Sequence, residues 1–192
     1  MGLDMYLNRM PRYADATVHD ISAVELYLDW KREKEEGKSY AQCSFREYGR
    51  VDVPHKRYRD FYRKFYKVYF ADWDTEKKYP RSGIMEQVGY WRKANQIHNW
   101  FVENVQDGVD DCDWHREVTK EDFEELLDAC YEVLNDPDSA EDILPTQGGF
   151  FFGSTEYGDW YMSQIRETIE IIENVLKTTD FEKEMVYYRS SW

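Results

Sequence analysis

The sequence predicts an α+β fold in which a small antiparallel or mixed sheet is packed by three to four amphipathic helices. Strand-like stretches occur at residues 3–8, 149–153 and 184–189, and apolar stripes at helical spacing lie between them. The 192 residues include 16 Tyr, 10 Phe and 7 Trp, whose side chains can bury enough surface for a sizeable core. Because this length fits one domain, we predict a single domain over residues 1–192, with 38–82 as a variable insertion.

The first predicted elements are a strand and a helix. Apolar and polar side chains alternate from Leu3 to Leu7, which predicts a strand that ends by Pro11. An apolar stripe then predicts a helix over residues 21–36, and Gly37 supplies its stop signal.

A segment over residues 55–73 combines aromatic residues at helical spacing with interleaved lysines and arginines. This pattern is typical of an amphipathic helix with its aromatic face in the core and its basic side chains in water. Two other interpretations stay open. The segment could bind nucleic acid or an acidic partner, or it could pack on the acidic half of the same chain.

Two helices are predicted in the middle of the chain. Residues 84–106 carry apolar side chains at helical spacing, and Gly108 closes this helix. Thr119 is followed three residues later by Asp122, which predicts an N-cap with a capping box. The helix after Thr119 is predicted to end at Pro137. Its predicted core positions are Phe123, Leu126, Leu127, Cys130 and Leu134.

The last part of the chain predicts a strand, a helix and a second strand. Phe150–Phe152 are bracketed by glycines and are predicted as a short buried strand. Ser154 or Thr155 is predicted to cap the next helix, whose apolar stripe continues to Leu176. Met185–Tyr188 is predicted as the final strand.

Charge is distributed unevenly along the chain. The formal net charge is −14, but residues 1–82 carry +3 and residues 83–192 carry −17. Residues 103–142 hold 16 acidic side chains against Arg116 and Lys120. We therefore expect no direct binding of nucleic acid through this half, because phosphate contacts need a basic surface.

The sequence also predicts a cytoplasmic location without membrane contact. No apolar run approaches the ~20 residues that a membrane helix needs, and the first residues lack the basic and apolar regions of a secretory signal. Three cysteines, Cys43, Cys112 and Cys130, are typical of free thiols in a reducing compartment.

The acidic side chains form the first candidate site. In the helix after Thr119 they fall on the outward face, where like charges at i,i+4 spacing destabilise the helix. Solubility alone rarely needs this density of charge, so we predict an acidic surface that binds a partner with a basic surface. The residues assigned to it are Asp110, Asp111, Asp113, Glu121, Glu124, Glu125, Asp128 and Glu132.

The second candidate site is a pocket for a nucleotide-like ligand. Hydroxyl groups and free backbone N–H groups at the start of a helix can hold an anion, which indicates Ser154 and Thr155. An aromatic plane beside amide and imidazole groups can bind a nucleobase, which indicates Trp91, Asn95 and His98. The simpler alternative is a capped helix beside an ordinary core tryptophan.

Patterns for metal binding and catalysis are incomplete. The loop at residues 107–115 fails the EF-hand spacing and offers zinc only Cys112 and His115, so neither a metal nor another cofactor is predicted. The four histidines are scattered, and no common catalytic motif occurs. His98 lies on the apolar face of its predicted helix, where a hydrogen-bonded core histidine is the simpler interpretation.

Three long blocks of the sequence are specific: MGLDMYL at residues 1–7, VGYWRKANQIHNWF at 88–101 and LPTQGGFFFGST at 144–155. With these blocks the chain resembles a family of small phage and prophage proteins, found largely in phages of Gram-positive bacteria and without an assigned activity. The likeness covers most of the chain and is loosest over residues 10–82. It implies a phage product in the host bacterial cytoplasm and supplies no catalytic residues.

Binding is therefore the expected mode of action, rather than catalysis. We expect first a phage accessory or counter-defence protein that binds and inhibits a host protein, for example a CRISPR nuclease, through the acidic surface. The second expectation is a sponge or receptor for a nucleotide signalling molecule. The third is an enzyme without a common motif, whose turnover would depend on His98.

Overall fold

The computed structural model describes residues 2–12, 17–19, 21, 36–37 and 85–192. The chain divides into two units, one made of Met1–Met10 with Glu86–Trp192 and the other of Pro11–Met85. The predicted insertion at 38–82 and the basic-aromatic segment at 55–73 lie outside the described residues, as does almost all of the predicted helix at 21–36. The single-domain assignment stays a prediction.

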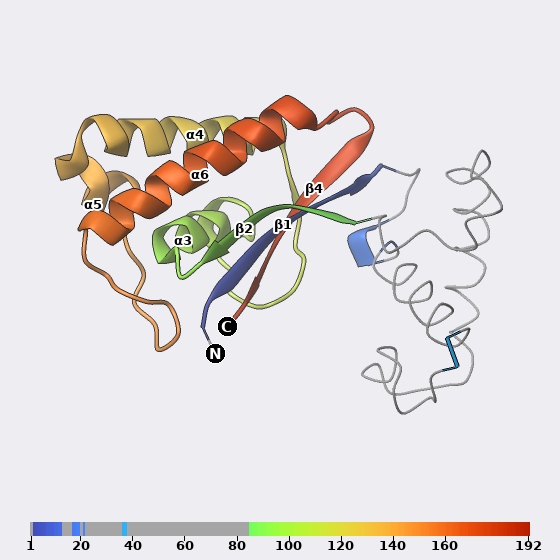
Figure 1. Cartoon of the computed structure of the whole chain (residues 1–192), viewed down its shortest axis with the longest axis horizontal. Coiled ribbons are helices and arrows are strands. Elements are labelled where there is room, and N and C mark those ends of the chain that lie inside the picture. The colour runs from blue at the N-terminus through green and yellow to red at the C-terminus, as the bar shows by residue number, and fades with distance from the viewer. Residues whose placement is uncertain (1, 13–16, 20, 22–35, 38–84) are drawn as a thin grey trace. The chain divides into compact units, whose positions relative to one another are not determined.

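A four-stranded antiparallel sheet forms one layer of the first unit (Figure 1). Its strand order is β2-β1-β4-β3, so the two central strands come from opposite ends of the sequence. The predicted first and last strands are confirmed, and so is the α+β fold class. The strands are β1 (Asp4–Pro11), β2 (Glu86–Arg92), β3 (Glu117–Val118) and β4 (Glu184–Ser191).

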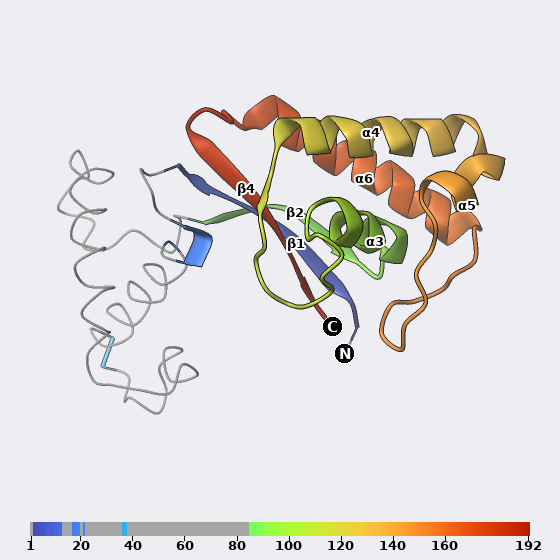
Figure 2. The same ribbon diagram turned by 180° about the vertical axis from the view of Figure 1, so that it is seen from behind.

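Helices form the second layer, on one side of the sheet (Figures 1 and 2). The two long helices α4 and α6 lie side by side, and α3 lies closer to the sheet. A 3₁₀ turn at Pro137–Ser139 joins α4 to the short α5. The helices are α3 (Asn95–Asn104), α4 (Lys120–Asn135), α5 (Ala140–Ile143) and α6 (Asp159–Thr178).

The core lies between the sheet and these helices. Phe101 of α3 stacks on Tyr188 of β4, with ring centroids 4.1 Å apart. Trp91 of β2 lies against Phe101, at 6.0 Å between centroids, and its Nε1 donates a hydrogen bond to Oγ1 of Thr168 in α6 (3.0 Å). Aromatic side chains from three elements therefore close the core, as expected from the aromatic content.

The helix predicted after Thr119 is confirmed at both ends. Oγ1 of Thr119 accepts from the N–H of Asp122 (3.1 Å), and Oδ2 of Asp122 accepts from the N–H of Thr119 (2.8 Å), which completes the capping box. The helix ends before Pro137. Cys130 is buried as predicted, and this burial raises the pKa of its thiol to about 12.

The predicted helix over residues 84–106 is wrong in its first half, where β2 forms instead and α3 begins only at Asn95. The strand packs closely against α6 at Gly89, where a Cβ would lie 2.8 Å from Cγ2 of Ile171. Lys93 then adopts a left-handed backbone with φ of 60°, which separates the strand from the helix. Pairing with β1 therefore overrides the helical periodicity of the sequence.

The predicted strand at residues 149–153 is also wrong, because this segment forms a turn in which the N–H of Phe152 donates to Gly149 O (3.1 Å). Phe152 is buried, whereas Phe150 is 96% exposed. Gly153 has φ of +96°, a conformation that suits glycine and turns the chain out of any strand. Ser154 and Thr155 do not cap α6, whose N-cap is Gly158.

Candidate functional site

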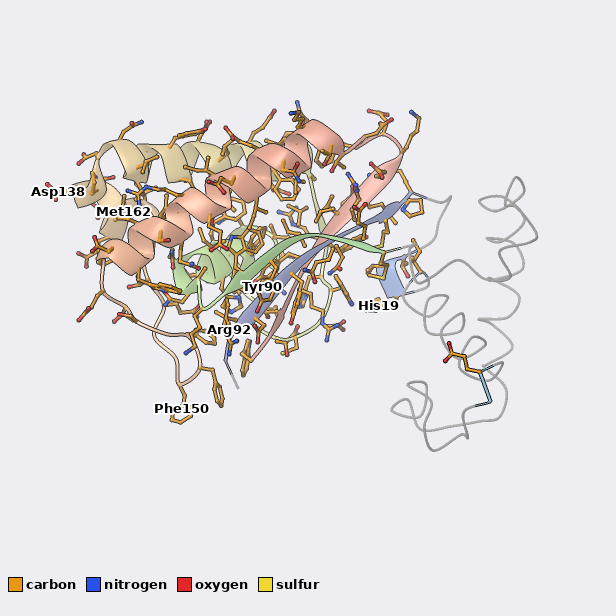
Figure 3. The ribbon with its side chains drawn as sticks, in the orientation of Figure 1. His19, Tyr90, Arg92, Asp138, Phe150 and Met162 are labelled. Carbon is orange, nitrogen blue, oxygen red and sulfur yellow. The ribbon has the colours of Figure 1, made fainter. Side chains whose placement is uncertain are left out.

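The exposed face of α4 carries five of the eight residues predicted to bind a partner. Phe123, Leu126 and Cys130 point into the core, so the amphipathic packing of the helix turns its acidic side chains to solvent. Figure 3 shows side chains projecting from α4 and α6 on the side away from the sheet. The five exposed acidic residues of α4 are Glu121, Glu124, Glu125, Asp128 and Glu132.

Helix α6 extends this acidic surface. The hydroxyl of Tyr131 in α4 donates to Oε1 of Glu173 in α6 (2.6 Å), which places Glu173 beside the exposed side of α4. Glu170 lies one helical turn earlier and is exposed as well. We call these residues together the acidic helix face: Glu121, Glu124, Glu125, Asp128, Glu132, Glu170 and Glu173.

Lys120 is the only basic residue of α4 beside the acids of that helix. Nζ of Lys120 lies 2.9 Å from Oε1 of Glu124, and this is the only ion pair on the face among the described residues. Like charges meet at i,i+4 spacing three times along α4, at residues 121 and 125, 124 and 128, and 128 and 132. Each such pair destabilises a helix. The face is therefore a site of electrostatic repulsion that a basic partner would relieve.

The other three residues of the predicted acidic surface lie elsewhere, in the loop beside the end of β4. Trp192 Nε1 donates to Oδ1 of Asp110 (3.2 Å), and Ser190 Oγ donates to Asp111 O (3.2 Å). The N–H of Asp113 donates to Oδ1 of Asp111 (2.8 Å), and with His115 this lowers the pKa of Asp111. These three acids therefore shape a loop and do not lie on α4 with the other five.

His98 is a hydrogen-bonded core residue, which confirms the simpler interpretation of the sequence. Its ring is fully buried, and burial lowers its pKa although Asp110 opposes that effect. Nε2 lies 3.1 Å from Oδ1 of Asp110, and Nδ1 lies 2.7 Å from the hydroxyl of Tyr188. A neutral ring that donates from Nε2 to the carboxylate leaves Nδ1 to accept from Tyr188.

The side chains of Trp91, Asn95 and His98, for which nucleobase contacts were predicted, are all buried. The loop approaches α3 as expected, but Asn95 itself holds the loop in place. Nδ2 of Asn95 donates to the carbonyl oxygens of Phe152 (3.2 Å) and Ser154 (2.8 Å), and Oδ1 accepts from the N–H of residue 147 (3.0 Å). Both N–H donors of Asn95 are therefore occupied within the protein.

Ser154 and Thr155, the other two residues of that prediction, are exposed. Ser154 also lines an open pocket of about 500 Å³, whose other walls the sequence analysis did not identify. A sequence signal for this pocket existed, because Arg92 and Lys93 are the only consecutive basic residues after residue 82. The residues that line the pocket are Arg92, Lys93, Gly153, Ser154 and Trp160.

Two further findings concern the described part of the chain. No group of three or more His, Cys, Asp or Glu side chains there is arranged to hold a metal ion. None of the helices described is both long enough and apolar enough to cross a membrane.

The chain was also compared with known proteins. No protein-family model matches it, and neither does any curated protein or any solved structure.

Proposed function

We propose that this protein is a phage-encoded counter-defence protein that acts in the host bacterial cytoplasm, where it binds and inhibits a host protein through the acidic helix face. The observation that carries the proposal is the row of exposed carboxylates on α4 and α6, of which one, Glu124, has an ion-pair partner among the described residues. The resemblance to phage proteins supports the setting.

In the absence of a partner, repulsion within the acidic helix face destabilises the protein. Each like-charge pair at i,i+4 spacing destabilises a helix by roughly 0.2–0.5 kcal/mol, and α4 has three of them. Replacing any of these acids by lysine or glutamine would remove the repulsion without disturbing the buried side of the helix. The presence of these acids is therefore better explained by binding than by folding.

The length of the row favours a partner that binds nucleic acid. At 1.5 Å per residue, the acids from Glu121 to Glu132 extend over ~16 Å. The phosphates of about five nucleotides on one DNA strand cover the same distance, since they follow at ~3.4 Å along the axis. A nuclease of a host defence system, such as a CRISPR nuclease, has a basic surface of this kind, and occupation of that surface would inhibit it.

The proposal can be tested by neutralising the face without changing its shape. The test variant carries Glu124→Gln, Glu125→Gln, Asp128→Asn and Glu132→Gln. The control variant carries Glu103→Gln, Asp138→Asn, Glu156→Gln and Glu182→Gln, four exposed acids outside the acidic helix face. Both variants lose the same amount of negative charge, so only the position of the charge differs.

Wild type and both variants are used as bait in lysates of a Gram-positive host, and captured proteins are assayed for nuclease activity with and without bait. We expect wild type and the control variant to capture and inhibit a basic host protein, with weaker capture at higher salt. The test variant should lose both effects. Equal capture and inhibition by the test variant would falsify the proposal.

A further inference from the structure

We infer that the pocket beside the start of α6 is a binding site for a nucleotide, in which Arg92, Lys93 and the loop at Gly153 hold a phosphate and Trp160 stacks on the base. This inference concerns a different part of the molecule from the acidic helix face and does not depend on the function proposed for that face. It rests on the charge of the pocket, on the direction of its backbone N–H groups and on its exposed tryptophan.

The pocket is basic in a part of the chain that is otherwise strongly acidic. Lys93 forms no ion pair among the described residues. Nε of Arg92 lies 3.9 Å from Oδ1 of Asp4, and the Arg92 side chain is 61% exposed, so this contact is long and screened by water. Two adjacent cations thus remain available to an anion from solution.

Asn95 turns backbone donors of the loop outward. Its Nδ2 holds the carbonyl oxygens of Phe152 and Ser154 on the inner side of the loop. In a trans peptide the N–H points opposite to the carbonyl of the same peptide unit, so the N–H of Gly153 points away from Asn95. No protein acceptor among the described residues takes the N–H of Gly153.

Gly153 also brings the loop close to the cations. A Cβ at this position would lie 3.1 Å from Cβ of Lys93, and its φ of +96° favours glycine. The hydroxyl of Ser154 accepts from the N–H of Glu156 (3.1 Å), which leaves its hydrogen free to donate. A free N–H group, a hydroxyl and two cations around one concave surface are donors that bind phosphate.

Trp160 adds an aromatic surface to this site. It lies in the first turn of α6, is 56% exposed and forms a wall of the pocket. In the free protein, a tryptophan this exposed is in unfavourable contact with water. Its ring offers a surface on which a nucleobase can stack. The volume of about 500 Å³ falls within the range of small-ligand sites. Together these features select a phosphate joined to a planar base.

Binding is measured by isothermal titration calorimetry with AMP, GMP, cyclic di-AMP, adenosine and inorganic phosphate. We expect at least one of the three nucleotides to bind at least tenfold more tightly than adenosine or inorganic phosphate. The double variant Arg92→Gln/Lys93→Gln should bind that nucleotide at least tenfold more weakly than wild type. The matched control Arg166→Gln/Lys177→Gln removes two exposed cations from α6 and should leave its affinity unchanged.

The role of Trp160 is separated from that of the cations by two more variants. Trp160→Ala should weaken the binding of the nucleotide but not that of inorganic phosphate. Trp160→Phe should keep most of the wild-type affinity, since stacking needs only an aromatic ring. Binding unchanged in Trp160→Ala overturns the stacking contact. Absence of binding by all three nucleotides below about 1 mM, or equal loss in both double variants, overturns the site. The altered side chains are exposed, so thermal melting should show that every variant folds.

Discussion

At the scale of single residues, the hydrogen bonds that join Tyr188, His98 and Asp110 explain why a histidine can be buried in this core. Both ring nitrogens have a hydrogen-bond partner, so the neutral ring leaves no polar atom unsatisfied. The same arrangement keeps His98, the residue on which the enzyme alternative depends, out of contact with solvent.

Tyr188→Phe tests this arrangement directly. The variant keeps the ring that stacks on Phe101 but removes the donor to Nδ1 of His98. We expect a loss of about 1–3 kcal/mol in the free energy of unfolding, the cost of an unsatisfied buried acceptor. Urea denaturation measures it. Tyr6→Phe on the neighbouring strand loses no described hydrogen bond and should change little; similar losses in both would contradict the assignment.

The burial of His98 also predicts how stability depends on pH. The pKa of His98 is lowered in the folded protein from its ordinary value of 6.5, so the unfolded chain binds the proton more readily. Stability from this residue is complete above about pH 6.5 and falls as the pH drops toward the lowered pKa. Unfolding free energies at pH 7.5 and 5.5 should therefore differ more in wild type than in His98→Gln. Equal differences would show that His98 titrates normally.

At the scale of elements, the close contact between β2 and α6 depends on one glycine. Gly89→Ala would place its Cβ 2.8 Å from Cγ2 of Ile171 and 3.1 Å from Cδ1 of Leu7. We expect a loss of roughly 1–3 kcal/mol in stability from this overpacking, measured by chemical denaturation. The control is Gly148→Ala, whose Cβ would meet only Cγ2 of Thr155 at 4.0 Å. If Gly89→Ala left the stability unchanged, α6 would have to be able to move away from the strand.

The elements that could be predicted from the sequence are those fixed by local interactions. Thr119 and Asp122 form their capping box within one turn, and the apolar stripe through Ile165 and Ile172 belongs to a single helix. β2 could not be predicted, because its strand conformation depends on pairing with β1, which lies some 80 residues earlier in the chain.

The candidate sites show the same limit. The acids of α4 were assigned correctly to an exposed face, since helical periodicity alone decides which side of α4 is buried. The basic pocket was missed, because Arg92 and Lys93 meet Gly153 and Trp160 only after the chain has folded. The sequence does not show that Trp91, Asn95 and His98 are buried, because an aromatic or amide side chain looks the same in sequence whether it faces a ligand or the core.

At the scale of the whole molecule, repulsion that arises from the net charge of −14 should lower the free energy of unfolding. Neutralising Glu124, Glu125, Asp128 and Glu132 together removes three repulsive pairs and one ion pair from α4. We therefore expect the unfolding free energy to rise by roughly 0.5–1 kcal/mol at low ionic strength. In 0.5 M salt the gain should shrink, because salt screens exposed charges. Thermal or urea denaturation at both salt concentrations provides the measurement, and an unchanged stability at low salt would contradict it.

The strand order has a consequence for how the protein is made. β1 and β4 are neighbours at the centre of the sheet, although almost the whole described sequence separates them. During translation β1 leaves the ribosome before β4, so its apolar side stays uncovered until β4 has been synthesised. Such long-range pairing closes slowly, since a large loop must be ordered before the contact forms. The helices α4 and α6 are in contact and lie closer together in the sequence, so they can associate before the sheet is complete.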